Sequence, residues 1–325
     1  MIWLSWRQQR TETLIAAAVL VLVSALLIPT GLDMASAYHH DGLSACLGTH
    51  PRSGCDQVVQ AFGERFRRAG ELLGWFTLVP GLIGVLLAAP FVLELENRTY
   101  RLAWTQSITR RRWITSKLAI TIAAALLAVL ALTLLMVWWH GPLDRLQGRM
   151  ENSVYDSEGI VPFGYVLFAL GLALSVGAVW RRTVPALVVA FVGYFASRIF
   201  VDTWLRQRLV SPLTATWPAG PSGKAPDPAG LKHAWVITES PSDKLGHALS
   251  FSLEPGACLR QLGSQGKSIA QSCPAPHLVA YMHAVYQPAS RFWLLQGIET
   301  GLFAGAALIL ILVAAWWTHE RTGKG

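Results

Sequence analysis

Apolar residues in this chain gather into six long runs, which polar segments separate. The runs cover Thr13–Leu32, Leu72–Leu93, Leu118–Trp139, Val161–Trp180, Val184–Val201 and Phe292–Trp317. Each run is close to the length of about 20 helical residues that crosses the hydrocarbon core of a bilayer. Tryptophans stand at the ends of several runs, as they do in the aromatic belts of membrane proteins. The pattern therefore predicts an all-α polytopic membrane protein with six transmembrane helices.

The composition supports a membrane protein over a soluble one. The 325 residues are 53% hydrophobic and 14% charged, and the mean hydropathy is +0.40. The net charge of +8 does not indicate nucleic-acid binding, because the cations flank the apolar runs and do not form a stripe along a polar helix. We expect a multi-pass protein of the cell membrane that contacts membrane lipid and no nucleic acid.

The charges of the short connections predict the orientation. The connection 94–117 between the second and third runs is strongly basic, whereas the connection 140–160 is acidic by comparison. Because cytoplasmic loops carry the excess of lysine and arginine, both termini are expected in the cytoplasm. The predicted parts are an N-terminal interfacial helix (1–12), transmembrane helices one to five (13–201), an extracytoplasmic loop (202–291), helix six (292–317) and a cytoplasmic tail (318–325).

Two interpretations of the first apolar run stay open. A basic head, an apolar run and then Ala35-Ser36-Ala37 are typical of a secretory signal with its cleavage site. The run is longer than a usual signal core, however, and Trp3 and Trp6 before Arg7 are typical of an interfacial helix, which favours an uncleaved first helix. Cleavage would leave the orientation of the other helices unchanged.

All four cysteines lie in segments that we expect outside the cytoplasm. Cys46 and Cys55 follow the first run, and Cys258 and Cys273 precede the sixth. This distribution is typical of disulfides in an oxidising compartment. It favours the pairs Cys46–Cys55 and Cys258–Cys273, while cross-pairing and free thiols stay open because spacing alone does not decide them.

No motif for catalysis or metal binding fits its context. Gly266-Lys267-Ser268 resembles the end of a phosphate-binding P-loop, but Gln261 occupies the place of the first glycine. His39-His40 near Cys46 lacks the paired-cysteine spacing of a zinc site. The sequence also contains no His-Glu-x-x-His and no Gly-x-Ser-x-Gly. We predict no metal site, no ATPase site and no intramembrane enzyme.

The two longest connections are expected to contain local structure. Apolar positions at helical spacing predict a helix over Asp56–Glu71. In the extracytoplasmic loop, residues 211–230 are rich in proline and glycine and predict irregular structure. A short strand over Ala234–Ser240 and a short helix over His277–Tyr286 are expected after it.

The connection 94–117 contains an amphipathic segment. One helical face takes Tyr100, Ala103, Trp104, Ser107 and Ile108, and the other takes Arg101, Thr105 and Arg112. The pattern predicts a short helix along the cytoplasmic surface, with one side against the membrane domain. The basic residues are then either a simple membrane anchor or a docking surface for a partner.

An acidic pair that ends one run, a short helix, a hydroxyl-Arg step and a lysine that opens the next run together resemble the permeases of the ATP-binding-cassette (ABC) superfamily, type-2 exporter class. The resemblance covers the whole chain. It implies a coupling helix over Tyr100–Thr109 that docks on a nucleotide-binding subunit, with Lys117 opening helix three. The implied coupling residues are Glu94, Glu96, Tyr100, Arg101, Trp104, Thr105, Gln106, Arg110 and Arg111.

The same resemblance accounts for a disulfide in a large outer loop between helices five and six. This chain departs from the class at two places. Arg98-Thr99 stands where the class often has Gly-Thr, and Gln106 precedes Ser107 where the class often has a proline. The resemblance implies a dimer with a second permease copy or homologue, and an ABC ATPase partner that binds ATP and Mg²⁺, with no cofactor in this chain.

Ionisable residues interrupt the fifth and sixth runs near their outer ends. Arg198 is followed four residues later by Asp202, and Glu299 follows Gln296 by one turn. A charge costs about 2.5–3.5 kcal/mol at mid-bilayer and faces a partner or a wet cavity. These four residues predict either a gate or a structural clamp between helices five and six, and the clamp is favoured.

The sequence therefore supports two functional hypotheses. The first is the permease subunit of an ATP-driven exporter, whose many apolar side chains favour a lipophilic or amphipathic substrate. The second is a membrane sensor or immunity protein that binds through its outer loop without transport. An ATPase with a complete P-loop encoded by the neighbouring reading frame would favour the first.

Overall fold

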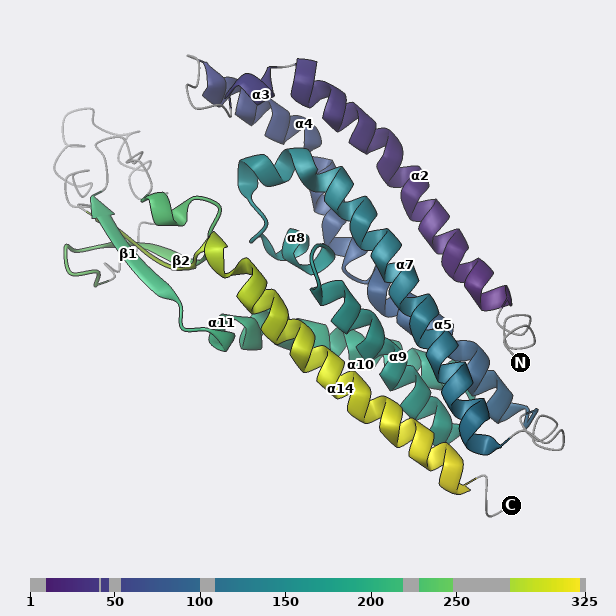
Figure 1. Cartoon of the computed structure of the whole chain (residues 1–325). Coiled ribbons are helices and arrows are strands. Elements are labelled where there is room, and N and C mark those ends of the chain that lie inside the picture. The colour runs from purple at the N-terminus through teal and green to yellow at the C-terminus, as the bar shows by residue number, and fades with distance from the viewer. Residues whose placement is uncertain are drawn as a thin grey trace, which may run out of the picture. The chain divides into compact units, whose positions relative to one another are not determined.

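The computed structural model describes residues 10–40, 42–46, 54–99, 109–218, 228–247 and 281–321. The chain forms two compact units (Figure 1): unit 1 is Met1–Leu209 with Phe292–Gly325, and unit 2 is Val210–Arg291. The described part of unit 1 is helical, whereas unit 2 contains a small sheet. The interfacial-helix residues 1–9, the coupling-helix residues 100–108, and Cys258 and Cys273 lie outside the described residues.

The described part of unit 1 is built from long and short helices. They are α2 (Arg10–His40), α3 (Leu43–Cys46), α4 (Cys55–Phe76), α5 (Val79–Glu96), α7 (Arg110–Gln147), α8 (Asn152–Ser157), α9 (Val161–Trp180), α10 (Thr183–Phe200) and α14 (Phe292–Arg321). After α10 the chain continues through a π-helical segment, η1 (Val201–Leu205), into α11 (Arg206–Leu209).

Six helical segments among the described residues are long and apolar enough to cross a membrane. They are Ala17–His40, Gly74–Glu96, Arg110–Leu146, Val161–Trp180, Thr183–Leu209 and Ala289–Glu320. The prediction of six spans is thus confirmed by length and composition. The helices extend beyond the predicted runs: α2 ends at His40 instead of Leu32, and α7 runs from Arg110 to Gln147. Hydropathy falls where a helix passes into polar surroundings, but its backbone hydrogen bonds continue there.

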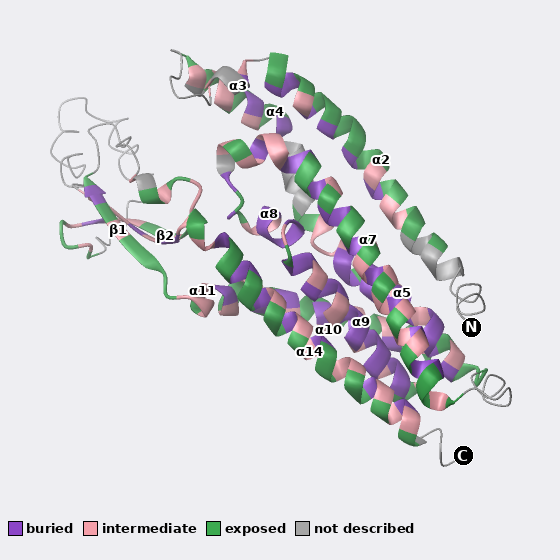
Figure 2. Cartoon of the chain, in the orientation of Figure 1, coloured by how far each residue is buried: buried purple, intermediate pink, exposed green. Residues whose placement is uncertain are grey.

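The helix α9 lies at the centre of unit 1, where it packs against α5, α10 and α14. Figure 2 shows α9 buried over most of its length, whereas α2 and α14 carry exposed residues at intervals along theirs. The approach of α5 to α9 is so close that a Cβ on Gly84 would lie 2.5 Å from the carbonyl oxygen of Val166. Small residues allow such contacts between membrane helices. Exposed apolar side chains such as Val188 and Leu312 suit contact with lipid.

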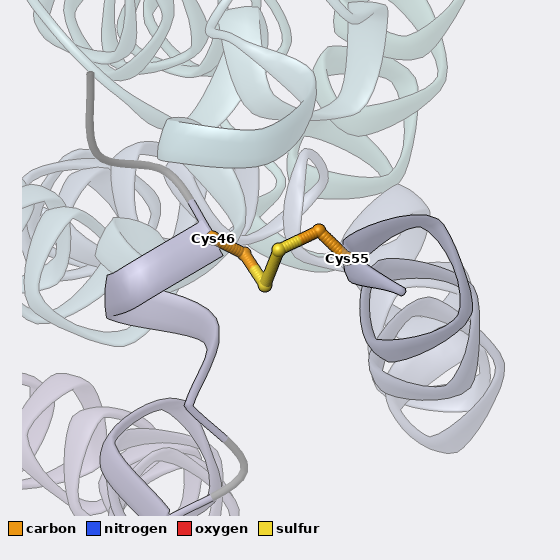
Figure 3. The surroundings of a disulfide bond; sticks show 2 residues. All are labelled: Cys46 and Cys55. Atoms are coloured by element: carbon orange, nitrogen blue, oxygen red, sulfur yellow. A yellow bond between two sulfur atoms is a disulfide. The ribbon is translucent and has the colours of Figure 1, made fainter. Parts of the chain in front are cut away.

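The helix predicted over Asp56–Glu71 is confirmed by α4, which packs Phe62 and Phe66 inward. Arg65 on α4 pairs with Asp33 on α2, with 3.0 Å between the nearest nitrogen and oxygen. The structure also contains a disulfide between Cys46 and Cys55, which joins α3 to the start of α4 (Figure 3). Together these contacts hold α4 to the end of α2.

Unit 2 contains an antiparallel sheet with the strand order β1-β3-β2. The strands are β1 (Leu213–Pro218), β2 (Trp235–Ser242) and β3 (Tyr281–Gln287), and two short 3₁₀ turns cover Ala229–Leu231 and Ala289–Arg291. The strand predicted over Ala234–Ser240 is confirmed. The irregular structure predicted over residues 211–230 is wrong for Leu213–Pro218, which form β1. The helix predicted over His277–Tyr286 is wrong for residues 281–286, which form the central strand. The fold is therefore mostly helical, not all-α.

Candidate functional site

Both ends of the connection between α5 and α7 are tied into unit 1. Glu94 in the last turn of α5 pairs with Lys117 near the start of α7, and the Lys117 side chain is only 3% exposed. Phe91 stacks on Trp113 beside the pair, with ring centroids 5.8 Å apart. The ammonium of Lys117 lies 5.5 Å from the centroid of the Trp113 ring. These contacts hold α5 to α7 within two turns of the connecting loop.

Glu96 links the same end of α5 to a third helix. Its carboxylate accepts hydrogen bonds from the Thr183 hydroxyl and from the Thr183 backbone N–H, with 2.8 Å between that nitrogen and Oε2. Thr183 is the first residue of α10. An acidic side chain at this place satisfies a free N–H group of the helix N-terminus and complements its dipole. The last turn of α5 therefore contacts both α7 and α10.

Only the two ends of the predicted coupling segment are described. Arg98 has a φ of 56°, in the left-handed region, and turns the chain away from the end of α5. Thr109 is extended just before α7, which begins with half-buried Arg110 and exposed Arg111. The predicted coupling residues Tyr100, Arg101, Trp104, Thr105 and Gln106 lie outside the described residues.

A second group of polar side chains is buried where α8, α9, the end of α10 and α14 meet. We call Asp156, Tyr165, Arg198, Arg206 and Glu299 the buried ionic cluster. Arg198 pairs with Asp156 and places Nη1 2.6 Å from the Tyr165 hydroxyl and 3.3 Å from Glu299 Oε1. Tyr165 donates to Glu299 across 2.5 Å. The side chains lie in surroundings where an unpaired charge would be strongly unfavourable.

Arg206 completes the buried ionic cluster. Its Nε and Nη2 each lie 3.0 Å from an oxygen of Glu299, and Nη2 lies 2.5 Å from Asp156 Oδ1. Arg206 and Glu299 are each 1% exposed. Two guanidinium groups thus face two carboxylates, so the charges within the cluster balance. Such balance is what a clamp between helices requires.

The π-helical segment η1 explains how both arginines reach one cluster. In an α-helix with 3.6 residues per turn, residues eight positions apart point about 80° apart around the axis. The wider turn of η1, between Arg198 and Arg206, reduces this rotation and brings the two guanidinium groups to one side. π-Helical turns inside α-helices occur frequently at functional sites.

Gln296 on α14 binds the start of α9. Its Oε1 accepts hydrogen bonds from the backbone N–H groups of Ile160 and Val161, each across 2.9 Å. Its Nε2 donates to the carbonyl oxygen of Tyr155 across 2.8 Å. Gln296 is fully buried, so it satisfies backbone groups that water does not reach. It joins α14 to the connection between α8 and α9.

The structure groups the predicted gate or clamp residues differently from the sequence. Arg198 and Glu299 meet, as the sequence suggested, but Asp202 pairs with Arg206 across 2.8 Å instead of with Arg198. Three cluster members, Asp156, Tyr165 and Arg206, were missed. The extracytoplasmic loop predicted from the sequence includes Arg206, whereas residues 202–209 continue the fifth span. The signal that could have identified Arg206 is its place in an apolar segment that continues beyond Val201.

An apolar cavity of about 500 Å³ lies next to the buried ionic cluster. Its walls come from α9, α10, η1 and α14 and include Phe168, Phe200, Leu302 and Phe303. Phe303 also contacts the cluster directly, because its ring centroid lies 5.0 Å from that of Tyr165. The cavity therefore offers an apolar surface beside a group of buried charges.

Comparison with known proteins gives one family match. A family model described as "ABC-2 membrane transporter related" matches residues 17–206, a segment that extends from α2 to Arg206 and includes both ends of the α5–α7 connection. No curated protein and no solved structure matches the chain significantly. Because the family match covers more than half of the 325 residues, the chain belongs to the ABC-2 membrane transporter related family and is a multi-pass permease component, not the ATPase, of an ABC transporter.

Proposed function

We propose that this chain is the permease subunit of an ATP-driven exporter, and that its α5–α7 connection receives the motion of a separate ATPase subunit. The observation that carries the proposal is the anchoring of both ends of that connection. Glu94 ties α5 to Lys117 on α7, and Glu96 ties it to Thr183 on α10. A displacement of the connection would therefore move three spans together.

The proposed mechanism is a rigid-body motion. The ATPase subunit binds ATP and Mg²⁺ and closes, and its closure pushes on the coupling helix predicted over Tyr100–Thr109. The buried pair of Glu94 and Lys117 transmits that push to the helix axes. Packed helices respond by tilting as bodies, because a close-packed interior does not deform continuously. Two permease chains, identical or homologous, would enclose the transport path between them.

The proposed orientation places the α5–α7 connection and both termini in the cytoplasm, with the protein in the cell membrane. The positive charge at the start of α7 supports this placement. The Cys46–Cys55 disulfide follows the end of α2, opposite the end of unit 1 where α5 leads into the connection (Figure 1). Disulfides persist in oxidising compartments, so this end is proposed to face outward.

The proposed cargo is lipophilic or amphipathic. The apolar cavity beside the buried ionic cluster supports this class, because Phe168, Phe200 and Leu302 offer hydrocarbon and aromatic surface without charge. Ligand cavities are commonly lined by such side chains, with a few polar groups that fix orientation. Among the lining residues, Ser197 carries a hydroxyl group.

Co-purification tests the proposal directly. The chain is expressed with the ATPase that the neighbouring reading frame encodes, purified through a tag on the permease, and placed in lipid vesicles. The ATPase is expected to co-purify and to hydrolyse ATP faster with the permease than alone, and a P-loop lysine variant of the ATPase serves as the negative control. A well-folded permease that binds no ATPase would favour the sensor hypothesis.

Two substitutions locate the contact. Trp104→Ala and Arg110→Glu are expected to reduce the stimulation of ATP hydrolysis, because both positions belong to the proposed docking surface. Lys244→Glu is the matched control, because it changes the net charge by the same amount as Arg110→Glu but lies in unit 2, outside the α5–α7 connection. Equal effects of Arg110→Glu and Lys244→Glu would contradict a docking role for the α5–α7 connection.

A further inference from the structure

Three metal-binding side chain types meet where α7 ends and the α8–α9 connection begins. His140 and Asp144 lie one turn apart on α7, with 2.5 Å between Nδ1 and Oδ1. Glu158 follows α8, and its Oε1 lies 3.8 Å from the same histidine nitrogen. One donor atom from each residue lies within 4.8 Å of the others. We call these three residues the His140 triad.

Glu158 is buried without a hydrogen-bond partner. The residue is 1% exposed, and neither of its carboxylate oxygens has a hydrogen bond within the described residues. Its nearest cation is Arg149, whose Nε lies 3.6 Å from Oε2, beyond hydrogen-bond distance. Buried carboxylates are normally hydrogen-bonded, paired or bound to metal. Oε1 of Glu158 faces His140 and Oε2 faces Arg149, but neither oxygen is hydrogen-bonded, so the triad needs a further cation or proton.

The two carboxylates of the His140 triad also favour a bound cation. Two carboxylates that approach one imidazole repel each other unless positive charge lies between them. Arg149 supplies part of that charge from the rim, but its side chain is 46% exposed and it also contacts Asp144 at 3.5 Å. A divalent ion would neutralise both carboxylates from within.

We propose that His140, Asp144 and Glu158 bind a divalent transition-metal ion of the Zn²⁺ class. One imidazole nitrogen and two carboxylate oxygens are ligands that Zn²⁺ and its neighbours accept, with a further position left for water. Mg²⁺ and Ca²⁺ prefer sites made of oxygen alone, so the imidazole disfavours them. The site is independent of the proposed transport role, because its residues do not belong to the coupling contacts.

The bound ion would fasten α7 to the start of α9. Two ligands come from α7 and the third lies three positions before the first residue of α9. The backbone carbonyl of Glu158 also accepts a hydrogen bond from Gln296 on α14 across 3.2 Å. Binding would thus stabilise the junction of three helices. Metal occupancy would affect the stability of unit 1 even in a chain separated from its ATPase.

Zn²⁺ titration of the full-length protein, with its affinity tag removed and after treatment with a chelator, tests the proposal. The wild type is expected to bind one equivalent of Zn²⁺ and to gain thermal stability on binding. His140→Ala and Glu158→Gln are expected to weaken binding by more than about tenfold, since loss of even an outer partner of a metal ligand costs that much. Co²⁺ should give visible absorption bands in the wild type that both variants lack.

A matched control comes from unit 2. His247 and Asp243 form a histidine–carboxylate pair across 3.0 Å with the same spacing of four residues, but the pair is exposed and has no third carboxylate grouped with it among the described residues. His247→Ala is therefore expected to leave Zn²⁺ binding unchanged. Equal binding by the wild type and by Glu158→Gln, or equal losses in His140→Ala and His247→Ala, would overturn the proposal.

Misfolding does not confound the outcome. Glu158→Gln removes a buried charge without changing the shape of the side chain, so the metal-free variant should be at least as stable as the metal-free wild type. A variant that melts at the wild-type temperature without metal and gains no stability from Zn²⁺ supports the site. A variant that still gains the full stabilisation contradicts it.

Discussion

Lys117 and Glu94 lie 23 positions apart in the sequence and form a buried ion pair that joins α7 to α5. The pair sits at the base of the α5–α7 connection, beside the stacked rings of Phe91 and Trp113. A connection held in this way passes a push to its helices, whereas a connection on loose ends would absorb it. The proposed coupling therefore depends on this pair.

Lys117→Met is expected to lower both stability and coupling. It leaves Glu94 without its ammonium partner, and breaking a buried ion pair from one side costs about 3–5 kcal/mol. The melting temperature of the purified chain and the stimulation of ATP hydrolysis measure the two effects. The exchange of both charges, Glu94→Lys with Lys117→Glu, should recover part of each. If the exchanged pair behaves no better than Lys117→Met, the ion pair is not the link between the helices.

Glu299→Gln tests whether the buried ionic cluster is a clamp or a gate. The substitution leaves the two guanidinium groups with Asp156 as their remaining buried carboxylate, so a loss of about 3–5 kcal/mol is expected. A clamp predicts a lower melting temperature and normal export by each folded complex. The double variant Arg206→Gln/Glu299→Gln removes one charge of each sign and should regain part of the stability. Lost export at an unchanged melting temperature would instead identify a gate.

Gln296→Leu is expected to destabilise unit 1. The leucine has a similar volume but leaves the N–H groups of Ile160 and Val161 and the carbonyl of Tyr155 without their partner. Each buried polar group left unsatisfied costs about 1–3 kcal/mol. Thermal unfolding measures the loss, with Gln296→Glu as the comparison that keeps one acceptor. A melting temperature equal to that of the wild type would mean that water replaces the amide.

Gly84→Ala is expected to push α5 away from α9. The added Cβ would lie 2.5 Å from the backbone carbonyl oxygen of Val166, and backbone atoms cannot turn aside as a flexible side chain can. Gly305→Ala on α14 is the matched control, because a Cβ there meets no described atom within 4 Å. Alanine favours helix over glycine by about 1 kcal/mol, so the control should match or exceed the wild-type melting temperature. Equal destabilisation by both variants would refute the close contact of α5 with α9.

The sequence predicts the spans well because burial in lipid demands long apolar helices, and that demand is visible residue by residue. It predicts their ends less well. The run that hydropathy ends at Val201 continues as a helix to Leu209, since charged residues that are paired inside the protein do not end a helix. Because of that difference, the sequence does not predict the role of Arg206, which is buried and contacts both Asp156 and Glu299 in the buried ionic cluster.

Short apolar segments carry less information. His277–Tyr286 suits a helix or a strand by composition, and pairing with β1 and β2 decides the strand over Tyr281–Gln287. The His140 triad was also beyond sequence reasoning, although His140 and Asp144 have helical spacing. Its third member, Glu158, reaches them only because the chain turns back after α7 through α8.

The proposed coupling requires that the α5–α7 connection touch the ATPase subunit in the cytoplasm. A photo-crosslinking residue at position 109, activated in whole cells that express both subunits, tests it most directly. A residue at position 245, where Leu245 is 81% exposed in unit 2, is the control. An adduct with the ATPase is expected from position 109 and none from position 245. An ATPase adduct from position 245, or only lipid adducts from position 109, would contradict the proposed coupling.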